Sequence, residues 1–246
     1  MAHSIRVGVG GWTFEPWRGV FYPDGLPHKR ELEFASRALT SIEINGTYYS
    51  TFKPDSWRKW AEMTPDTFVF SVKASRFCTN RKVLGSAGPA VEKFMAQGLT
   101  QLGAKLGPIN WQFMATKKFD AADFEAFLRL LPREKDGLVL RHALEVRHES
   151  FATPAFYEMA ARHTMAIVHA LDEDFPEIDQ PTADFSYARL METHKKLKNG
   201  VNEVQLAALA RLARAKAGRG DVFAYFISGA KIRNPAAAQA LMGKLG

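Results

Sequence analysis

The feature that most constrains the fold of this chain is a repeated alternation of strand-like and helix-like patterns. Eight short runs rich in β-branched and aromatic residues recur along the 246 residues, and most are followed by an amphipathic helical pattern. This alternation is typical of parallel βαβ units. Because eight strands close a TIM-type barrel, we predict an α/β fold in which residues 1–246 form a single closed parallel (β/α)8 TIM-type barrel domain. The runs begin near Ile5, Ser41, Thr67, Ile109, Leu144, Met165, Phe185 and Val222.

The helical patterns between these runs differ in clarity. The last one has a start and a stop signal, because Asn202 can cap the first turn, Gln205 stands three residues later, and Gly218 follows the pattern. Residues 172–184, between the sixth and seventh strands, contain two prolines and no helical pattern. We expect an irregular loop there and leave open an imperfect barrel at that point. The expected helices include Lys29–Leu39, Ala90–Lys105, Ala121–Leu131 and Glu203–Ala217.

The composition excludes several classes of protein. With 46% hydrophobic and 24% charged residues, the chain can bury a large core, unlike a disordered or fibrous protein. Cys78 is the only cysteine, which excludes an intramolecular disulfide and a cysteine-based metal site and fits a reducing compartment. Residues 1–4 show no signal-peptide pattern, and no segment approaches about 18 uninterrupted apolar residues. We therefore expect a soluble cytoplasmic protein that does not span a membrane.

Motifs for covalent or nucleotide chemistry are absent from the sequence. The chain has no Gly-x-Ser-x-Gly nucleophile elbow, and Cys78 has no activating partner nearby in the sequence. The cluster Gly8-Val9-Gly10-Gly11 matches neither the dinucleotide-binding nor the Walker pattern. We interpret it as a tight turn after the first strand.

Period-two alternation within the predicted strands selects the side chains that point into the barrel. In the second strand, Ile42 and Ile44 share the face that must pack on the helices, so Glu43 and Asn45 point inward near the C-terminal end. TIM-barrel enzymes place their chemistry at that end. Applied to the third, fourth, fifth and seventh strands, the same rule adds Ser71, Lys73, Gln112, Glu145, Arg147, Tyr187 and Arg189.

These inward residues predict a polar pocket with two kinds of chemistry. Lys73, Arg147 and Arg189 are candidate contacts for an anion, since arginine makes paired charge-assisted hydrogen bonds to phosphate or carboxylate. Glu43 and Glu145 are candidate catalytic acid/base groups, because burial and charged neighbours can adjust a carboxyl pKa for proton transfer. The alternative is that the two glutamates form buried ion pairs that fix the register of the barrel.

The net charge of +7 allows a second kind of partner. Part of the excess clusters between Arg189 and Arg219, so nucleic acid is a candidate partner beside a small anionic ligand, and a solvated surface is the alternative. A metal-dependent hydrolase of nucleic acid would need a metal cage. The available ligands are Glu43, Glu145, His148, His169 and Asp172. No motif such as His-Glu-x-x-His demands such a cage, so we predict no metal ligand.

Short motifs distributed along the chain resemble those of one known family. They are Gly11-Trp12-Thr13, Trp17-Arg18-Gly19, Phe21-Tyr22-Pro23, Ile42-Glu43-Ile44-Asn45-Gly46-Thr47-Tyr48-Tyr49, Pro54 with Trp57, Thr64-Pro65, Phe68-Val69-Phe70-Ser71-Val72-Lys73, Leu106-Gly107-Pro108 with Gln112, and Glu145-Val146-Arg147-His148-Glu149-Ser150. In order and spacing they resemble the domain-of-unknown-function 72 family, also called YecE-like, over most of the chain. The resemblance implies a YecE-like barrel and no established activity.

The resemblance also implies which polar positions recur in the family. They map onto Glu43, Asn45, Tyr48, Lys73, Gln112, Glu145, Arg147, His148 and Arg189, which adds Tyr48 and His148 to the residues that alternation selects. The chain departs from the family pattern at three places. The usual Arg-x-His-Gly after the seventh strand reads Arg189-Leu190-Met191-Glu192, the paired asparagines after the eighth are replaced by Ile227-Ser228, and Thr-His after the third becomes Thr79-Asn80. These departures indicate a divergent branch with altered substrate or weakened chemistry.

The sequence favours an enzyme, or an enzyme-derived binder, of a phosphate- or carboxylate-bearing ligand held at the C-terminal strand ends. Two alternatives stay open: a metal-dependent nucleic-acid or phosphodiester hydrolase, and a non-enzymatic ligand-binding or interaction protein. The catalytic candidates are Glu43 and Glu145, and the ligand-binding candidates are Asn45, Tyr48, Lys73, Gln112, Arg147, His148 and Arg189. The sequence identifies neither a cofactor nor an oligomeric state.

Overall fold

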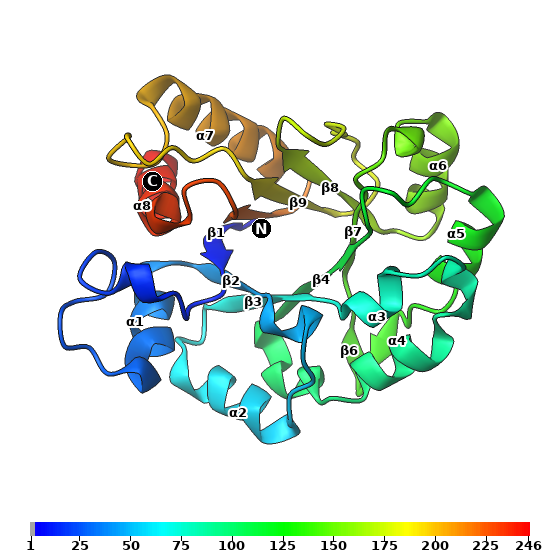
Figure 1. Ribbon diagram of the computed structural model, residues 1–246, viewed down its shortest axis with the longest axis horizontal. Coiled ribbons are helices and arrows are strands. Elements are labelled where there is room, and N and C mark those ends of the chain that lie inside the picture. The colour runs from blue at the N-terminus through cyan, green and yellow to red at the C-terminus, as the bar shows by residue number, and fades with distance from the viewer. Residues whose placement is uncertain (1–2) are drawn as a thin grey trace.

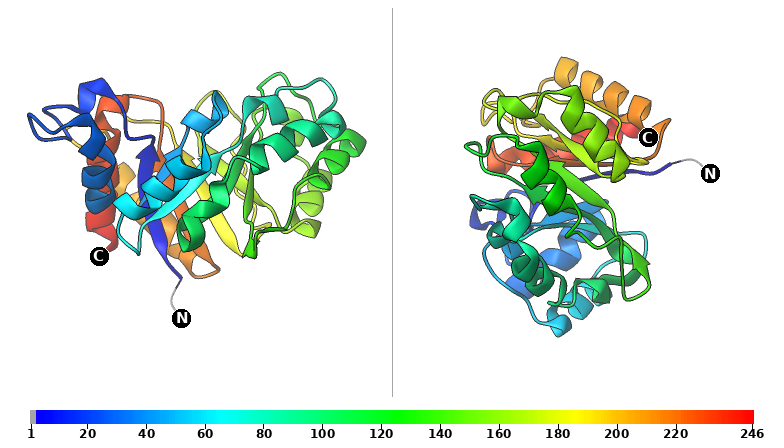
Figure 2. Two further views of the ribbon diagram at one scale, coloured as in Figure 1. Left: turned by 90° about the horizontal axis from the view of Figure 1, so that it is seen from below. Right: turned by 90° about the vertical axis from the view of Figure 1, so that its right-hand side faces the viewer.

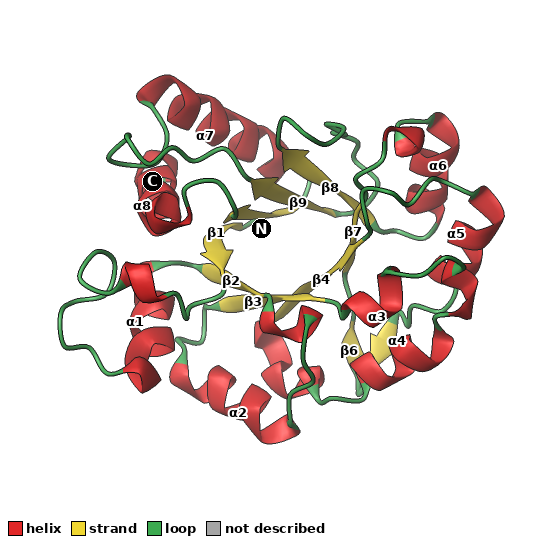
Figure 3. Ribbon diagram, viewed as in Figure 1, coloured by secondary structure: helices red, strands yellow, loops and turns green. Residues whose placement is uncertain are grey.

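Eight parallel strands form a closed barrel in the computed structural model, which describes residues 3–246 (Figures 1 and 3). Met1 and Ala2, which belong to the N-terminus for which we expect no signal peptide, lie outside the described residues. The order around the barrel is β1-β10-β9-β8-β7-β4-β3-β2. The strands are β1 (Ile5–Gly10), β2 (Ser41–Ile44), β3 (Val69–Lys73), β4 (Leu106–Gln112), β7 (His142–Glu145), β8 (Ala166–Leu171), β9 (Phe185–Leu190) and β10 (Asp221–Phe226). The predicted closed α/β barrel is confirmed.

The helices lie outside the ring of strands, as Figure 3 shows. They are α1 (Glu31–Ala38), α2 (Pro54–Met63), α3 (Arg76–Thr79), α4 (Gly88–Met95), α5 (Ala121–Leu128), α6 (Pro154–Arg162), α7 (Glu203–Ala217) and α8 (Asn234–Leu245). Short 3-10 helices are η1 (Glu15–Trp17), η2 (His28–Arg30), η3 (Gly46–Tyr48), η4 (Leu84–Ser86), η5 (Leu99–Lys105), η6 (Glu149–Phe151) and η7 (Lys231–Arg233). The strands begin at the end of the barrel where the described N-terminus lies (Figure 2).

Two of the expected helices show how local signals act. The bounds of α7 are as predicted, and its capping box is present, because the Asn202 side chain accepts from the Gln205 amide at 2.8 Å and the Gln205 side chain accepts from the Asn202 amide at 3.0 Å. The single helix expected over residues 90–105 is instead divided. Gly98, with a φ of 95°, adopts a left-handed conformation that ends the α-helical part and leads into η5.

The crossover between β8 and β9 is the irregular segment that the prolines predict. No helix occurs in residues 172–184. The barrel is nevertheless closed there, since β8 pairs with β9 from Val168 opposite Tyr187 to Leu171 opposite Leu190, and the imperfection left open from the sequence is not confirmed. A small antiparallel hairpin, β5 (Glu134–Lys135) and β6 (Leu138–Val139), lies outside the barrel.

Side chains alternate between two cores as the period-two pattern predicts. Ile42, Phe70 and Trp111 belong to the cluster between the strands and the helices. Residues on the opposite strand faces form a second cluster within the barrel, which includes Val69, Ala143, Val168, Tyr187, Phe223 and Tyr225. The inward faces of the strands therefore carry aromatic and aliphatic residues toward the N-terminal ends of the strands. The charged inward residues lie near the C-terminal ends.

The glycine cluster after the N-terminus has a different role from the tight turn expected. Gly8 and Gly10 lie within β1, and only Gly11, with a φ of 73°, belongs to the turn that follows. A Cβ atom at Gly8 would lie 1.8 Å from the carbonyl oxygen of Ser41. Gly8 is therefore required by the close approach of β1 and β2 rather than by a turn.

Candidate functional site

A cavity of about 540 Å³ opens at the C-terminal ends of the barrel strands. Four basic side chains line it, Lys73, Arg147, Arg189 and Lys231, and no aspartate or glutamate is among its lining residues. The other lining residues are Gly10, Asn45, Tyr48, Tyr49, Gln112, Ile227, Ser228 and Asn234. Two buried glutamates, Glu43 and Glu145, offset two of these four positive charges from beneath the cavity, and the excess positive charge that is left favours a negatively charged occupant.

Strand ends position most of this lining. Gly10, Lys73 and Gln112 are the last residues of β1, β3 and β4, and Asn45 directly follows β2. Parallel strands end on the same side of a barrel, so residues far apart in the sequence meet at one mouth. The sequence predicts this convergence for Asn45, Lys73, Gln112, Arg147 and Arg189, and the structure brings these five side chains to one cavity.

Glu145 lies beneath the cavity and accepts hydrogen bonds from three residues. Arg189 Nη1 is 2.7 Å from both Oε1 and Oε2 of Glu145, and Arg147 donates to Oε1 from Nε at 3.0 Å and from Nη2 at 2.6 Å. Asn110 Nδ2 donates to Oε2 at 2.9 Å. The carboxylate has no exposed surface. Glu145 therefore holds both arginines of the cavity in place.

Glu43 occupies the equivalent position below the other side of Arg189. Arg189 Nη2 donates to Glu43 Oε1 at 3.2 Å, and Asn110 Nδ2 lies 3.3 Å from Oε2. The Tyr187 hydroxyl also donates to Oε2. Glu43, like Glu145, is fully buried and is not among the lining residues of the cavity. The two glutamates thus form the buried ion pairs that were one of the two alternatives for them.

The electrostatics of this network follow from burial and close charges. Burial by itself would raise the pKa of Glu145, but the guanidinium groups of Arg189 and Arg147, the Lys73 ammonium and the Asn110 hydrogen bond together lower it to about 2. Burial would lower the pKa of Arg189, yet Glu145 and Glu43 raise it. The pKa of Tyr187 is raised by burial and by the charge of Glu43. Glu145 and Arg189 are therefore both ionised at neutral pH, and Tyr187 keeps its proton.

Lys73 differs from the two arginines because its amine has no carboxylate partner. Among the described residues, no hydrogen bond or ion pair is formed by its Nζ, which lies 4.4 Å from the centroid of the Tyr48 ring. Burial and the nearby charge of Arg189 lower the pKa of Lys73 to about 8, against the opposing effect of Glu145 and Glu43. A measurable fraction of this lysine is therefore neutral near pH 7.

Three lining residues also carry a buried polar atom without a partner in the described part of the chain. They are Asn45 Oδ1, Gln112 Oε1 and Arg189 Nε. Buried polar atoms are normally hydrogen-bonded, because an unpaired one loses its hydration without compensation. The wall of the cavity therefore contains two amide oxygens and one guanidinium N–H whose hydrogen-bonding capacity is unused among the described residues.

Side chains that could hold a metal ion are not gathered at this site. Residues 3–246 contain no group of three or more His, Cys, Asp and Glu side chains arranged to bind one. His148 Nδ1 accepts from the Ser150 amide at 3.1 Å and caps η6, and His169 Nε2 pairs with Glu177 at 2.7 Å. The cage that a metal-dependent hydrolase would require is therefore not assembled from the residues considered for it.

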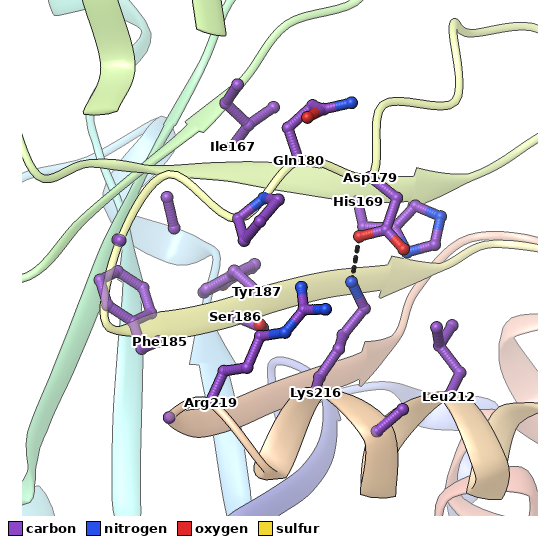
Figure 4. Close-up of a pocket in the computed structure, with 15 residues that line it drawn as sticks. Ile167, His169, Asp179, Gln180, Phe185, Ser186, Tyr187, Leu212, Lys216 and Arg219 are labelled. Carbon is purple, nitrogen blue, oxygen red and sulfur yellow. Dashed lines mark hydrogen bonds and ion pairs between the residues drawn. The ribbon is translucent and has the colours of Figure 1, made fainter. Parts of the chain in front are cut away.

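A second, smaller cavity of about 150 Å³ lies beside β8 and β9, between the helix-free crossover and α7 (Figure 4). His169, Asp179, Lys216 and Arg219 are among its lining residues, and Lys216 forms an ion pair with Asp179. Arg189, the first residue of the basic stretch, is only 2% exposed inside the barrel. Arg189 is therefore not part of the protein surface, and the charge of Lys216 is paired with Asp179.

Comparison with known proteins identifies the family of this chain. A family model described as "Protein of unknown function DUF72" matches residues 6–246. The chain belongs to the DUF72 family. No helix among the described residues has both the length and the apolar character needed to cross a membrane.

Relatives of the DUF72 chain include the UPF0759 protein YecE of Escherichia coli K12, which is 27% identical over 150 residues. That alignment covers 60% of this chain and 50% of the relative, so the match spans about half the length of the curated protein. A DUF72 family protein of Thermotoga maritima has the same fold, with a TM-score of 0.78, 24% identity and 98% of each chain covered. A second, from Enterococcus faecalis, gives a TM-score of 0.75 at 16% identity, covering 99% of this chain and 97% of the other.

Some of the residues suggested by the DUF72 resemblance line the cavity in the structure, and others do not. Tyr48 lines the cavity, and its hydroxyl accepts from Asn80 Nδ2 at 3.2 Å, so Asn80 contacts the site where the family usually has histidine. His148 is not among the lining residues. Ile227 and Ser228 line the cavity in place of the usual asparagines, and Ser228 has a φ of 64°.

Sequence reasoning missed several residues of the DUF72 site, among them Asn110 and Lys231. Asn110 joins both glutamates, and the same alternation that places Gln112 inside the barrel also places Asn110 there, two residues earlier. Lys231 lies in η7, outside any strand, so no periodicity could have selected it. Its Nζ lies 4.3 Å from the centroid of the Phe14 ring, which comes from the first loop of the chain.

Proposed function

We propose that this DUF72 chain is an enzyme, or an enzyme-derived binder, that holds a small phosphate- or carboxylate-bearing ligand in the cavity at the C-terminal strand ends. The observation that carries the proposal is the lining itself, which has four basic side chains and no acidic one. A cavity of about 540 Å³ is within the range of roughly 300–1,000 Å³ typical of small-molecule sites. The ligand class is therefore a compact anion.

Arg147 and Arg189 are the principal anion contacts in this proposal. Glu145 orients both guanidinium groups from below, so their positions are set before a ligand binds. Donors that are already oriented lose little conformational freedom on binding. Lys73 and Lys231 add positive charge from two other sides of the cavity.

Asn45 and Gln112 extend the ligand class. Their side-chain oxygens are buried without partners, and an oxygen acceptor is satisfied by a hydroxyl or amino donor. A ligand that carries hydroxyl groups beside its phosphate or carboxylate would satisfy both kinds of lining. Tyr48 can contribute its ring face to the same ligand.

The roles of Glu43 and Glu145 in proton transfer remain a prediction. Their complete burial beneath the cavity favours positioning of Arg189 and Arg147 over direct contact with a ligand. No observation favours the alternative of a metal-dependent nucleic-acid hydrolase, and His148 and nucleic acid stay predictions as ligand contact and partner. The non-enzymatic alternative involves the same binding step. Chemical conversion of the bound ligand would distinguish an enzyme from a non-enzymatic binding protein.

A thermal-shift series tests the proposal. Glycerol 3-phosphate and inorganic phosphate should raise the melting temperature of the parent protein more than chloride at equal ionic strength, because a ligand that binds only the folded state stabilises it. Arg147→Met should lose most of that shift. Arg58→Met, which changes an exposed arginine on α2, should retain it. Equal shifts with phosphate and chloride, or an unchanged shift in Arg147→Met, would refute the proposal.

A further inference from the structure

Lys73 is a basic residue of the cavity whose environment suits a chemical step as well as charge. Arg147 and Arg189 are committed to Glu145 and Glu43 by hydrogen bonds. Lys73 Nζ makes no such bond to any described residue, although the side chain is largely buried at the end of β3. An amine held in a cavity without a carboxylate contact is available to react.

The surroundings of Lys73 favour the neutral amine, which has the lone pair that a nucleophile needs. Burial is the larger cause and the positive charge of Arg189 the next, and together they bring the pKa of Lys73 to about 8. At pH 7 a lysine of this pKa is about one-tenth neutral, whereas an ordinary lysine is less than about one-thousandth neutral. Lysines activated in this way are used as covalent nucleophiles toward carbonyl groups.

We propose that Lys73 Nζ forms an imine with the carbonyl carbon of a hydroxylated, phosphate-bearing carbonyl compound held in the cavity. This inference rests on the proposed function, since Arg147 and Arg189 hold the phosphate in it. In this inference Asn45 and Gln112 also have a role, because they accept hydrogen bonds from hydroxyl groups of the same ligand.

The chemistry balances without an oxidant or a reductant. The neutral amine attacks the carbonyl carbon, so a C–N bond forms and the carbonyl oxygen takes up the proton that the nitrogen loses, which gives a carbinolamine. Loss of the hydroxyl group with one further proton as water then breaks the C–O bond and leaves a C=N bond to Lys73. The protonated imine withdraws electrons from the adjacent carbon, which allows proton removal or C–C cleavage there.

Lys231 is the other lysine of the cavity, and its surroundings differ. Its Nζ lies 4.3 Å from the Phe14 ring centroid and 5.9 Å from that of Trp17, and burial alone lowers its pKa. The pKa of Lys73 is lowered by burial and also by the charges of Arg189 and Arg147. Lys73 lies over one ring and near two guanidinium groups. Attachment of the ligand to Lys73 rather than Lys231 is therefore a specific expectation.

Reductive trapping tests the inference directly. The parent protein is incubated with dihydroxyacetone phosphate and sodium borohydride, and the modified residue is located by peptide mapping with mass spectrometry. Borohydride converts an imine to a stable secondary amine, so the expected product is one adduct on Lys73 with the mass of the probe less one oxygen atom. Dihydroxyacetone, which lacks the phosphate, should label Lys73 at least about tenfold less at the same concentration, as expected for loss of an interaction of at least 1.4 kcal/mol.

Two variants control the experiment. Lys73→Arg keeps the positive charge but has no nucleophilic amine, so it should lose the adduct. Lys118→Arg changes an exposed lysine before α5 and should give the parent adduct.

The outcomes separate the two proposals. An adduct on Lys231, labelling spread over exposed lysines, equal labelling by dihydroxyacetone, or no adduct would each overturn the imine at Lys73. If glycerol 3-phosphate still stabilises the parent in that case, the anion-binding proposal stands alone. If it does not, the proposed function fails as well. Peptide mapping of the labelled parent protein shows which lysine carries the adduct even if Lys73→Arg does not fold.

Discussion

Arg189 Nη1 lies 2.7 Å from each carboxylate oxygen of Glu145 and joins β9 to β7, two strands that do not pair with each other. The same guanidinium reaches Glu43 on β2 through Nη2 at 3.2 Å. One arginine therefore links three strands across the barrel interior. Because all three side chains are almost fully buried, loss of one charge leaves the others without compensation.

Glu145→Gln is expected to destabilise the protein strongly. The amide keeps the shape of the side chain but removes the charge that balances Arg189 and Arg147, and breaking a buried ion pair typically costs about 3 to 5 kcal/mol. Urea unfolding at pH 7 measures the change. Glu149→Gln, an exposed change four residues away, should alter the free energy of unfolding by less than about 0.5 kcal/mol. A stability of Glu145→Gln equal to that of the parent would show that the network is not structural.

Protonation of Glu145 should determine part of the loss in the free energy of unfolding at acid pH. Its pKa falls from the ordinary value of 4.5 to about 2 in the folded protein. As the pH falls, the unfolded chain therefore takes up this proton first, and the stabilisation is complete above about pH 4.5 and is lost as the pH falls toward 2. The parent should lose stability more steeply than Glu145→Gln across this window. Parallel profiles from pH 5 to pH 2 would contradict this assignment.

Lys73→Met is expected to stabilise the protein at neutral pH. The pKa of Lys73 is lowered from 10.5 to about 8 on folding, so the charged lysine opposes folding below pH 8 by about 3 kcal/mol. Between pH 8 and 10.5 the folded protein has released this proton while the unfolded chain keeps it, and the opposition disappears as the pH rises. The advantage of Lys73→Met should therefore shrink over this range.

Urea titrations at pH 7, 9 and 10 follow that difference between Lys73→Met and the parent. Lys118→Met, in which an exposed lysine is replaced, provides the comparison and should show no pH-dependent advantage. A constant difference at all three pH values would mean that lost packing or hydration, and not the charge of Lys73, determines the effect.

Ser228→Asn is expected to give a small gain in stability. Ser228 has a φ of 64°, a left-handed conformation that asparagine tolerates better than serine. Relief of this backbone strain should raise the free energy of unfolding by roughly 0.5 kcal/mol, which is less than the full strain energy of a left-handed non-glycine residue. Thermal unfolding at pH 7 measures it, with Ser228→Ala as the control that should give no gain. A decrease in melting temperature for Ser228→Asn would mean that contacts of the serine outweigh its backbone strain.

Much of the architecture could be predicted because its signals are local. Each strand carries its own pattern of β-branched and aromatic residues, and alternation assigns Glu43, Lys73 and Arg189 to the barrel interior without knowledge of any neighbour. The division of the predicted helix over residues 90–105 was missed because Gly98 within a helical pattern is compatible with either a break or a continuous helix. His148 follows a strand, and its distance from the cavity depends on a loop conformation that no periodicity describes.

The sequence by itself determined where the barrel strands follow one another along the chain and which side of each strand faces inward. It also determined the end of the barrel at which the polar residues gather. All three depend only on spacing along one chain. Only the tertiary structure decided which charges meet. Arg189 pairs with Glu145 and Glu43, and Lys73 has no carboxylate partner within residues 3–246. Both facts depend on the closure of the barrel and on distances across its interior. These distances join strands that are not neighbours, and hydrogen bonding between neighbouring strands alone does not specify them.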